Sequence, residues 1–457
     1  MAAVVVAKNA SRKTFAGFCL VFLLLSGFYL ATFDYRGISD TRLNSLQTRS
    51  LVTHGDIDLA RYGSGTSRTY VVHRDDHVYS IYGIGVSLVA APLYLLGSRF
   101  DVADSTLEGV AAIAAVAAAG AILFRLLLQL VPARIASVGL VVFAFGTTMW
   151  PVAAMALFQH GPVALLQAIG LNGVFSHKRS SPAVAGFGFA AATLIRTPAV
   201  ILLVVMGLFY LTQGKRSVAL YIAGAAMPMG AFLLQNRWLW GVWLTTGYAQ
   251  IGDKFHGGNV PRGVFALLFG WWRGIFVYSP ILLAGVLGWL TALRSPKGFI
   301  ERRMVFLGGS CLLSVLLYAG YPQWWGGLNQ FGYRYLLDIV SPLVVLGAWA
   351  MARQPRLRPI AMLLAVLSIM NMSFGMAGNR FGWDFAMFPR AFGDTPLGQA
   401  WIVFVHYPTG SILRLLGVAA IAAILAALAP HLATGRQWSR PQATLKRSGR
   451  RPEDAHG

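Results

Sequence analysis

The chain has 457 residues, of which 56% are hydrophobic and 12% are charged. This apolar fraction exceeds what a soluble core of the same length buries, so the composition favours a membrane protein. The formal net charge is +22, but the Lys and Arg residues stand in short clusters between long apolar runs. That pattern is typical of cytoplasmic loops between membrane helices and excludes nucleic acid as the expected partner. Cys19 and Cys311 both lie within apolar runs, so no disulfide framework is expected.

The first apolar run, 14–32, follows Lys8, Arg12 and Lys13 and lacks a small-residue cleavage site. It therefore predicts an uncleaved first membrane helix. Basic clusters mark the loops expected in the cytoplasm, and apolar runs of spanning length alternate between them. The further predicted spans are 108–130, 135–156, 160–176, 181–195, 198–212, 217–234, 274–293, 304–320, 335–351, 358–376 and 410–430.

These segments predict an all-α, polytopic membrane protein of about 12 transmembrane helices, within a range of 11 to 13. Residues 1–430 are expected to form one membrane domain, with 33–78 as its first extracytoplasmic loop. Residues 431–457 are expected to be a basic, disordered tail. An even number of spans places both termini in the cytoplasm, and we expect a bacterial inner membrane.

One apolar segment, 79–97, does not fit this alternation, because a crossing there would move the later basic loops outside. It contains Gly83, Gly85 and Pro92, which favour a re-entrant or interfacial segment. The alternative is thirteen crossings with one basic loop misplaced.

The first outer loop contains a candidate catalytic acid. Asp40 precedes a stretch with Leu43, Leu46 and Leu51 near helical spacing, and Gly55 closes it. This pattern predicts a short amphipathic helix on the outer membrane surface, with Asp40 as its N-cap and Gly55 as its C-terminal stop. Such a helix would hold the Asp40 carboxylate at the bilayer edge, although a plain capping role is the alternative.

An acid soon after the first span, followed by a Gly that ends a surface helix, resembles the first periplasmic loop of GT-C glycosyltransferases. The likeness is to the dolichyl-phosphate-mannose and aminoarabinose transferase type, and Asp40 and Gly55 carry it. The Lys or His usual before the proline at position 92 is absent. Further segments are similar to uncharacterised bacterial members in the same order: 79–85 with 91–94, 146–151 with 159–160, 236–238 with 246–248, 278–280, and 324–327 with 333–335.

The resemblance implies a sugar donor on a polyprenyl phosphate, a membrane-lipid setting, and a glycan or lipid acceptor on the extracytoplasmic face. It also assigns the role of general base, or of acceptor orientation, to Asp40. The chemistry agrees, since sugar transfer needs a carboxylate to take a proton and cations to hold the leaving phosphate. A lipid or polysaccharide transporter or flippase is the rival hypothesis. The gathering of carboxylates in outer loops favours the enzyme.

Asp76 is the candidate for a second catalytic acid, because it precedes Tyr79 in the outer loop. It belongs to 73–77, which holds two His and two Asp side chains. That spacing matches no standard metal site, so no metal ligands are assigned, and a divalent metal stays open as a cofactor.

The residues expected to bind substrate are Arg334, His160, Arg196 and Tyr248. The Arg334 guanidinium suits a donor phosphate, whereas an ion pair with Asp338 one turn later is the alternative. Arg196 is expected to reach phosphate as well. His160 has a structural role as its alternative, and Tyr248 lies in one of the segments that carry the resemblance.

Overall fold

The computed structural model describes residues 2–35, 37–65, 70–250, 252, 257–296, 298–326, 331–378 and 392–432. Helix accounts for 78% of the structure and strand for 2%, which confirms the all-α prediction apart from one small hairpin. The predicted disorder of the tail falls almost wholly outside the described residues.

The chain begins with α1 (Ala2–Ala31) and α2 (Ser39–His54). An antiparallel hairpin of β1 (Val71–Arg74) and β2 (His77–Ser80) and the short helix α3 (Gly85–Gly97) follow. The remaining elements are α4 (Asp104–Leu130), α5 (Ala133–Phe145), η2 (Met149–Ala153), α6 (His160–Phe175), α7 (Ser181–Ile195), η3 (Thr197–Ala199), α8 (Val200–Leu211), α9 (Lys215–Trp240), α10 (Gly247–Gln250), α11 (Val260–Phe269), α12 (Ile275–Tyr278), η4 (Pro280–Leu282), α13 (Leu283–Arg294), α14 (Phe299–Ala319), η5 (Tyr335–Ile339), α15 (Val340–Arg353), α16 (Arg358–Gly378), α17 (Pro396–His406) and α18 (Pro408–Leu432).

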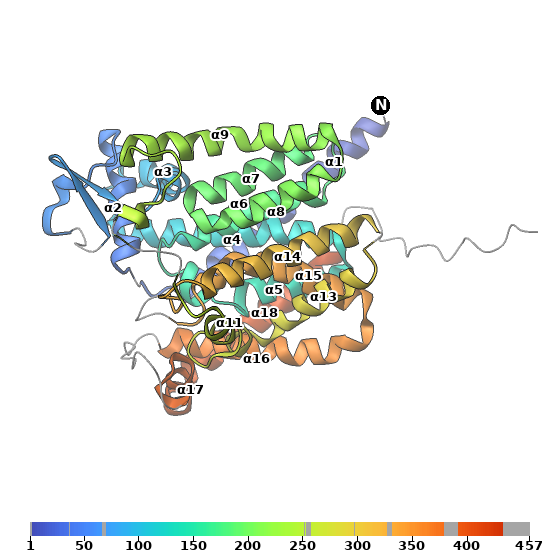
Figure 1. The fold of residues 1–457 in the computed structure, drawn as a ribbon. Helices are drawn as coiled ribbons and strands as arrows, with labels where there is room; N and C mark the ends of the chain where they lie inside the picture. The colour runs from blue at the N-terminus through green and yellow to red at the C-terminus, as the bar shows by residue number, and fades with distance from the viewer. Residues whose placement is uncertain are drawn as a thin grey trace, which may run out of the picture.

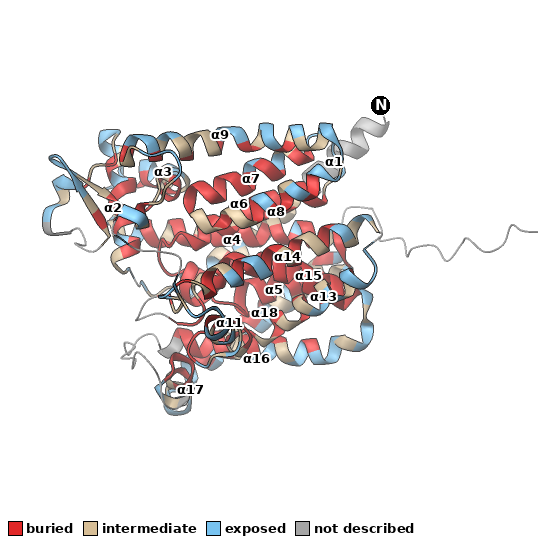
Figure 2. Cartoon of the chain, viewed as in Figure 1, coloured by how far each residue is buried: buried red, intermediate tan, exposed pale blue. Residues whose placement is uncertain are grey.

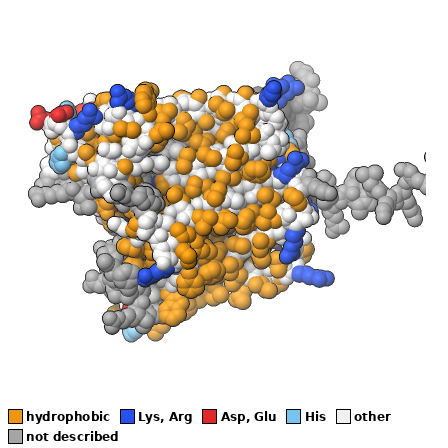
Figure 3. Space-filling view, in the orientation of Figure 1, with side chains coloured by type: hydrophobic (Ala, Val, Ile, Leu, Met, Phe, Trp, Pro, Cys, Tyr) orange, Lys and Arg blue, Asp and Glu red, His pale blue; other side chains and the backbone are white. Residues whose placement is uncertain are grey.

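The long helices lie side by side in one bundle, with α2, α3 and the hairpin at one end (Figure 1). We call this the hairpin end. The connections between α6 and α7, α8 and α9, and α13 and α14 lie at the opposite end, where Figure 3 shows a row of Lys and Arg side chains. We call this the basic end.

Buried residues concentrate in the middle of the bundle, on α4, α5, α6, α7 and α15, whereas few residues of α9 are buried (Figure 2). An apolar band covers the visible outer face between the two ends (Figure 3). Among the described residues, five helical segments are long and apolar enough to cross a membrane: Asp104–Leu130, Lys215–Trp240, Tyr335–Arg353, Pro355–Met376 and Pro408–Leu432. These features indicate a membrane protein, while the count of twelve spans stays a prediction.

Glycine lets α7 and α9 approach closely. A Cβ atom at Gly224 of α9 would lie 2.0 Å from the carbonyl oxygen of Ala183, and one at Gly186 of α7 would lie 2.0 Å from that of Tyr221. Helices that pack without a hydrophobic driving force gain contact by such small-residue interfaces. This interface fixes α7, which carries Arg196 directly after its last residue.

The structure corrects the prediction for the helix after the first span. Gly55 does end α2 in the left-handed conformation, with φ of 75°. However, Ile38 is the N-cap residue, because the Thr41 hydroxyl accepts a hydrogen bond from the Ile38 backbone and donates one to its carbonyl. Asp40 is thus the second helical residue, and its carboxylate is free for a tertiary contact. Most of α2 is buried against neighbouring segments, and its exposed side carries Arg42, Arg49 and Thr53. Its place on the membrane surface stays a prediction.

Two predicted spans are broken. The segment 135–156 is not one helix, because α5 ends at Phe145, Gly146 is its C-cap, and a π-helix follows over Met149–Ala153. The segment 274–293 is interrupted before Pro280, which has no backbone N–H to continue α12. Short elements at these places leave irregular backbone near the hairpin end.

The segment 79–97 forms the end of β2 and then α3, a helix of 13 residues that packs against α2 and α4. At 1.5 Å per residue it is about 20 Å long, which is too short for a perpendicular crossing of about 30 Å. Its place beside α2 at the hairpin end agrees with a re-entrant or interfacial segment (Figure 1).

Candidate functional site

Asp40 and Arg334 form a buried ion pair at the hairpin end. Asp40 comes from the first turn of α2, and Arg334 stands directly before η5, so two distant segments meet here. The Arg334 guanidinium also lies over the Phe158 ring, with 4.7 Å between Cζ and the ring centroid. Among the described residues, the buried Nε–H of Arg334 has no hydrogen-bond partner. The guanidinium therefore keeps a donor for one more oxygen atom.

A second buried ion pair joins Arg196 to Asp338. The Tyr318 hydroxyl donates to the carboxylate oxygen that Arg196 also binds, 3.0 Å from Asp338 Oδ2, and His160 Nδ1 lies 3.4 Å from Asp338 Oδ1. The Arg196 guanidinium lies between aromatic rings, 5.1 Å from the Tyr318 centroid and 5.3 Å from that of Tyr335. Asp338 thus holds three groups from three different helices or turns.

Tyrosine side chains connect the two pairs. The Tyr335 ring stacks on Tyr318 at 5.2 Å, and the Tyr82 ring meets Tyr248 at 6.0 Å. Burial raises the pKa of Tyr82 and of Tyr248 above the usual value near 10, and the negative charge of Asp40 adds to both shifts. Both phenols therefore stay neutral at pH 7 and can donate hydrogen bonds beside the Asp40 carboxylate.

A small cavity of about 30 Å³ adjoins Arg196 and Tyr248. Polar side chains that line it are already bonded to backbone: Gln159 Nε2 donates to Ile195 O at 3.1 Å, and Gln235 Oε1 accepts from the Ile84 N–H at 2.9 Å. Such a volume holds about one water molecule. Larger pockets open at the hairpin surface and at the basic end, and neither contains Asp40.

The structure brings together residues that the sequence placed far apart. One network at the hairpin end contains five of the six predicted site residues: Asp40, Arg334, Arg196, His160 and Tyr248. The sixth, Asp76, lies at the exposed turn between β1 and β2. No contact among the described residues joins it to Asp40. The predicted alternative partner of Arg334, Asp338, instead binds Arg196.

The sequence prediction of the site lacked two buried carboxylates: Glu108 was not considered, and Asp338 was considered only as a partner of Arg334. Glu108 of α4 is fully buried, accepts a hydrogen bond from the Tyr35 hydroxyl at 2.9 Å, and accepts another from the Leu157 N–H at 3.3 Å. An ionisable residue within a predicted membrane span indicates a functional site by default. Both Glu108 and Asp338 lie within predicted spans, so the sequence contained this indication.

Arg273 was missed as well. It is 1% exposed, and it donates to the Trp325 carbonyl at 2.9 Å and to the Gly332 carbonyl at 3.2 Å. Of its two neighbours, Trp272 is buried and Trp271 is exposed. Arg273 therefore binds the backbone at Trp325 and at Gly332, two residues before Arg334.

No metal site is formed by the residues that the structure describes, since no three His, Cys, Asp or Glu side chains among them gather as ligands. His77, from the cluster considered for metal, instead lies 2.8 Å from Asp58 Oδ2 through its Nδ1 atom. Asp58 also accepts from the backbone N–H groups of Ala60 and Val78, which ties the hairpin to the preceding turn.

No family model matches this chain, and no curated protein matches it. The resemblance to GT-C glycosyltransferases therefore stays an expectation that rests on the residues quoted for it. The geometry of the network at the hairpin end carries the functional argument.

Proposed function

We propose that this protein is an integral membrane glycosyltransferase that moves a sugar from a polyprenyl-phosphate carrier to an acceptor hydroxyl at the hairpin end. The observation that carries the proposal is the buried pair of Asp40 and Arg334, which sets a proton acceptor against a phosphate-binding cation. Sugar transfer from a phosphate needs these two groups in reach of one reacting carbon.

The proposed transfer needs a proton acceptor and a cation for the leaving phosphate, and Asp40 and Arg334 supply them. The acceptor oxygen forms a bond to C1 of the sugar while the bond from C1 to the phosphate oxygen breaks. The electron pair of the broken bond leaves with the polyprenyl phosphate, and the hydroxyl proton passes to the Asp40 carboxylate. Arg334 holds the leaving phosphate, because a guanidinium binds phosphate oxygens through paired N–H donors.

The ion pair itself offers a route to the reactive state. A donor phosphate that takes the Arg334 guanidinium would release Asp40 from its partner and leave the carboxylate able to accept a proton. Arg196, held by Asp338 and two tyrosine rings, supplies a second fixed cation beside the cavity.

In this proposal the hairpin end faces the extracytoplasmic side and the basic end faces the cytoplasm of a bacterial inner membrane. The row of Lys and Arg side chains at the basic end supports that orientation, since positive residues accumulate in cytoplasmic loops (Figure 3). Both termini then lie in the cytoplasm, with the acceptor a glycan or lipid outside.

The test is transfer of labelled sugar from a panel of polyprenyl-phosphate sugars by the full chain in proteoliposomes. We expect turnover in the wild type and a loss of about a hundredfold or more in Asp40→Asn. Asp101→Asn is the matched control, because Asp101 is an exposed acid at the same end with φ of 51°, a conformation that Asn also adopts.

Equal turnover in wild type and Asp40→Asn would overturn the role of Asp40. Movement of a labelled lipid across the bilayer with no sugar transfer from any donor would overturn the enzyme and support the transporter. Circular dichroism of each variant separates a lost reaction from a lost fold.

A further inference from the structure

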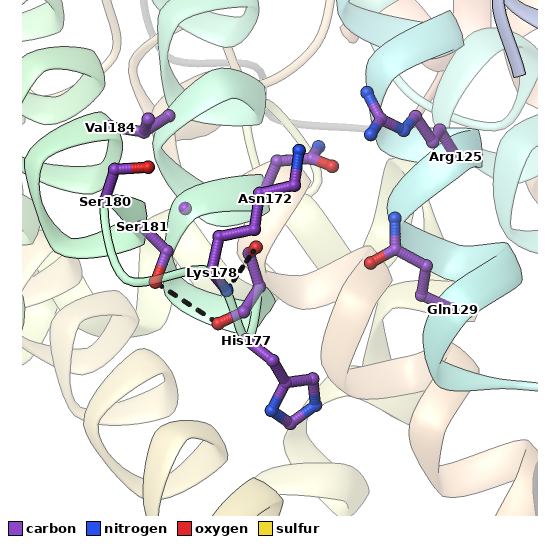
Figure 4. Close-up of a pocket in the computed structure, with 10 residues that line it drawn as sticks. Arg125, Gln129, Asn172, His177, Lys178, Ser180, Ser181 and Val184 are labelled. Carbon is purple, nitrogen blue, oxygen red and sulfur yellow. Dashed lines mark hydrogen bonds between the residues drawn. The ribbon is translucent and has the colours of Figure 1, made fainter. Parts of the chain in front are cut away.

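A second polar site lies at the basic end, in a pocket of about 530 Å³ between α4, α6 and α7. Figure 4 shows its lining, with Arg125 and Gln129 of α4 on one side and Ser180 and Val184 near the start of α7 on the other. Asn172 of α6 and the turn that carries His177 and Lys178 lie between them.

This pocket is far from the proposed active site. α4 starts at the hairpin end, where Asp104 pairs with Arg49 of α2, and Arg125 lies on the same helix near its other end. The rise of 1.5 Å per residue puts roughly 30 Å between Asp104 and Arg125. The pocket therefore belongs to a different surface of the protein.

The lining is cationic and rich in neutral donors. It contains Arg125, Lys178 and His177 but no Asp or Glu. Among the described residues neither Arg125 nor Lys178 has an ion-pair partner, whereas the nearby Arg353 at the same end is paired with Glu301. Unpaired cations that converge on one pocket favour an anionic ligand.

Several polar groups of the pocket are fixed in place by backbone bonds. Asn172 Nδ2 donates to the carbonyls of Ile122 at 3.1 Å and Ala168 at 3.0 Å, which holds the side chain between α4 and α6. The Ser181 hydroxyl donates to the Ser176 carbonyl at 3.3 Å and closes the turn that presents Lys178. α7 also begins here, so the positive end of its dipole faces the pocket.

The depth of Arg125 suits a group at the membrane interface. Arg125 lies five positions before Leu130, the last residue of α4, which places it roughly 7 Å inside the helix end. Val184 is an exposed apolar residue on the opposite wall. A ligand held here therefore meets cations on one side and an apolar surface on the other, as a lipid headgroup does.

We propose that the pocket formed by Arg125, Lys178 and the start of α7 binds a phosphate group, as carried by an anionic membrane lipid. Arg125 and Lys178 bind the phosphate oxygens, and the side chains of Gln129 and Ser180 bind the remaining polar atoms of the headgroup. The bound lipid bridges α4, α6 and α7 at the basic end. This phosphate site does not depend on whether the protein transfers sugar.

The test uses the full chain in neutral detergent micelles and follows thermal unfolding by tryptophan fluorescence. Four probes are titrated separately: dioctanoyl-phosphatidylglycerol, dioctanoyl-phosphatidylcholine, glycerol 3-phosphate and inorganic phosphate. The variant is Arg125→Gln with Lys178→Gln. The matched control is Arg134→Gln with Arg216→Gln, which removes two exposed cations at the same end but outside the pocket.

We expect phosphatidylglycerol to raise the unfolding temperature of wild type and control in a saturable way. In the pocket variant the apparent affinity for phosphatidylglycerol should fall by at least about tenfold, because one or more charge-assisted hydrogen bonds are lost. Phosphatidylcholine should bind more weakly, because its own cation opposes Arg125 and Lys178.

The soluble probes distinguish a lipid phosphate from a soluble phosphate as the ligand. Saturation by glycerol 3-phosphate or inorganic phosphate as strong as that by phosphatidylglycerol, and lost in the variant, would support phosphate binding but from a soluble ligand. An identical response of wild type, pocket variant and control to every probe would overturn the site. Because both substituted side chains are exposed, the variants should unfold at the wild-type temperature without ligand.

Discussion

The carboxylate of Asp40 and the guanidinium of Arg334 stand 294 positions apart in the sequence and form a buried ion pair in the fold. Each charge is expensive to bury alone, so the pair constrains how α2 and the segment before η5 can pack. The contribution of the pair to the free energy of unfolding can be measured.

Breaking this pair from either side should leave an uncompensated buried charge. Arg334→Gln and Asp40→Asn should each lower the free energy of unfolding by about 3–5 kcal/mol, and the double variant should lose much less than the sum. SDS-induced unfolding of the four proteins measures the coupling. Strictly additive losses would show that the two side chains do not interact in the membrane.

Loss of the Asp338 charge should destabilise the protein more than loss of one hydrogen bond that Asp338 accepts. Asp338→Asn leaves the Arg196 cation buried without its counter-ion, and we expect a loss of about 3–5 kcal/mol in unfolding free energy. Tyr318→Phe removes only one hydrogen bond to the same carboxylate and should cost about 1 kcal/mol. Similar losses from the two changes, again by SDS unfolding, would argue that Asp338 is protonated and uncharged.

Two glycines of α9 should respond to alanine with opposite signs. Gly224→Ala puts a methyl group against the Ala183 backbone and should destabilise by about 1–3 kcal/mol through overpacking. Gly230→Ala meets no atom within 4 Å, so the better helix propensity of Ala should stabilise by up to about 1 kcal/mol. Thermal unfolding in matched micelles compares them, and a stabilised Gly224→Ala would contradict the close α7–α9 contact.

The hairpin should depend on pH through His77. Its hydrogen bond with Asp58 raises the pKa of His77 above its usual value near 6.5. Burial acts to raise the pKa of Asp58, but the bonds from His77 and from the backbone outweigh it and lower that pKa.

The contribution of this contact is therefore fully present between the ordinary pKa of Asp58, near 3.8, and the ordinary pKa of His77, near 6.5. It is lost as the pH rises through the raised value, and also as the pH falls through the lowered pKa of Asp58. An NMR titration of the His77 ring should show the raised pKa in wild type and a return toward 6.5 in Asp58→Asn. An unchanged titration in that variant would remove Asp58 as the cause.

The proposed orientation can be checked by labelling single cysteines in a background with Cys19→Ser and Cys311→Ser. An impermeant maleimide should label Asp76→Cys on intact cells, because the hairpin turn is exposed and faces outside. Arg179→Cys at the basic end should react only after permeabilisation. The reverse pattern would place the Asp40–Arg334 pair in the cytoplasm and exclude an extracytoplasmic acceptor.

Local features of the fold were predictable from sequence where the causes are local. The segments 160–176 and 181–195 agree closely with α6 and α7, and Gly55 ends α2 as its neighbours indicate. Hydropathy did not reveal the break after Phe145, because an apolar run continues through Gly146 and Pro151 while the backbone changes its hydrogen bonding.

The site was predictable as a set of residues but not as a set of contacts. Asp338 stands one turn from Arg334 and was the obvious local partner, yet tertiary packing pairs it with Arg196 and gives Arg334 to Asp40. Helical periodicity describes neighbours three or four positions apart and carries no information about segments that meet across the bundle. The cap assigned to Asp40 failed for a local reason, since the Thr41 hydroxyl closes the first turn on Ile38, two residues before Asp40.

The modest lengths of α7 and α8 set the depth at which Arg196 lies. α7 has 15 residues and α8 has 12, or about 22 and 18 Å, so neither matches a hydrocarbon layer of about 30 Å. Exposed Val204, Leu208 and Leu211 give α8 an apolar outer face, and a bilayer accommodates a short spanning helix by local thinning. In the proposed function, such thinning would bring the leaflet surface beside the α7–α8 turn closer to Arg196, so that a headgroup reaches that arginine while its acyl or prenyl tail stays in the hydrocarbon layer.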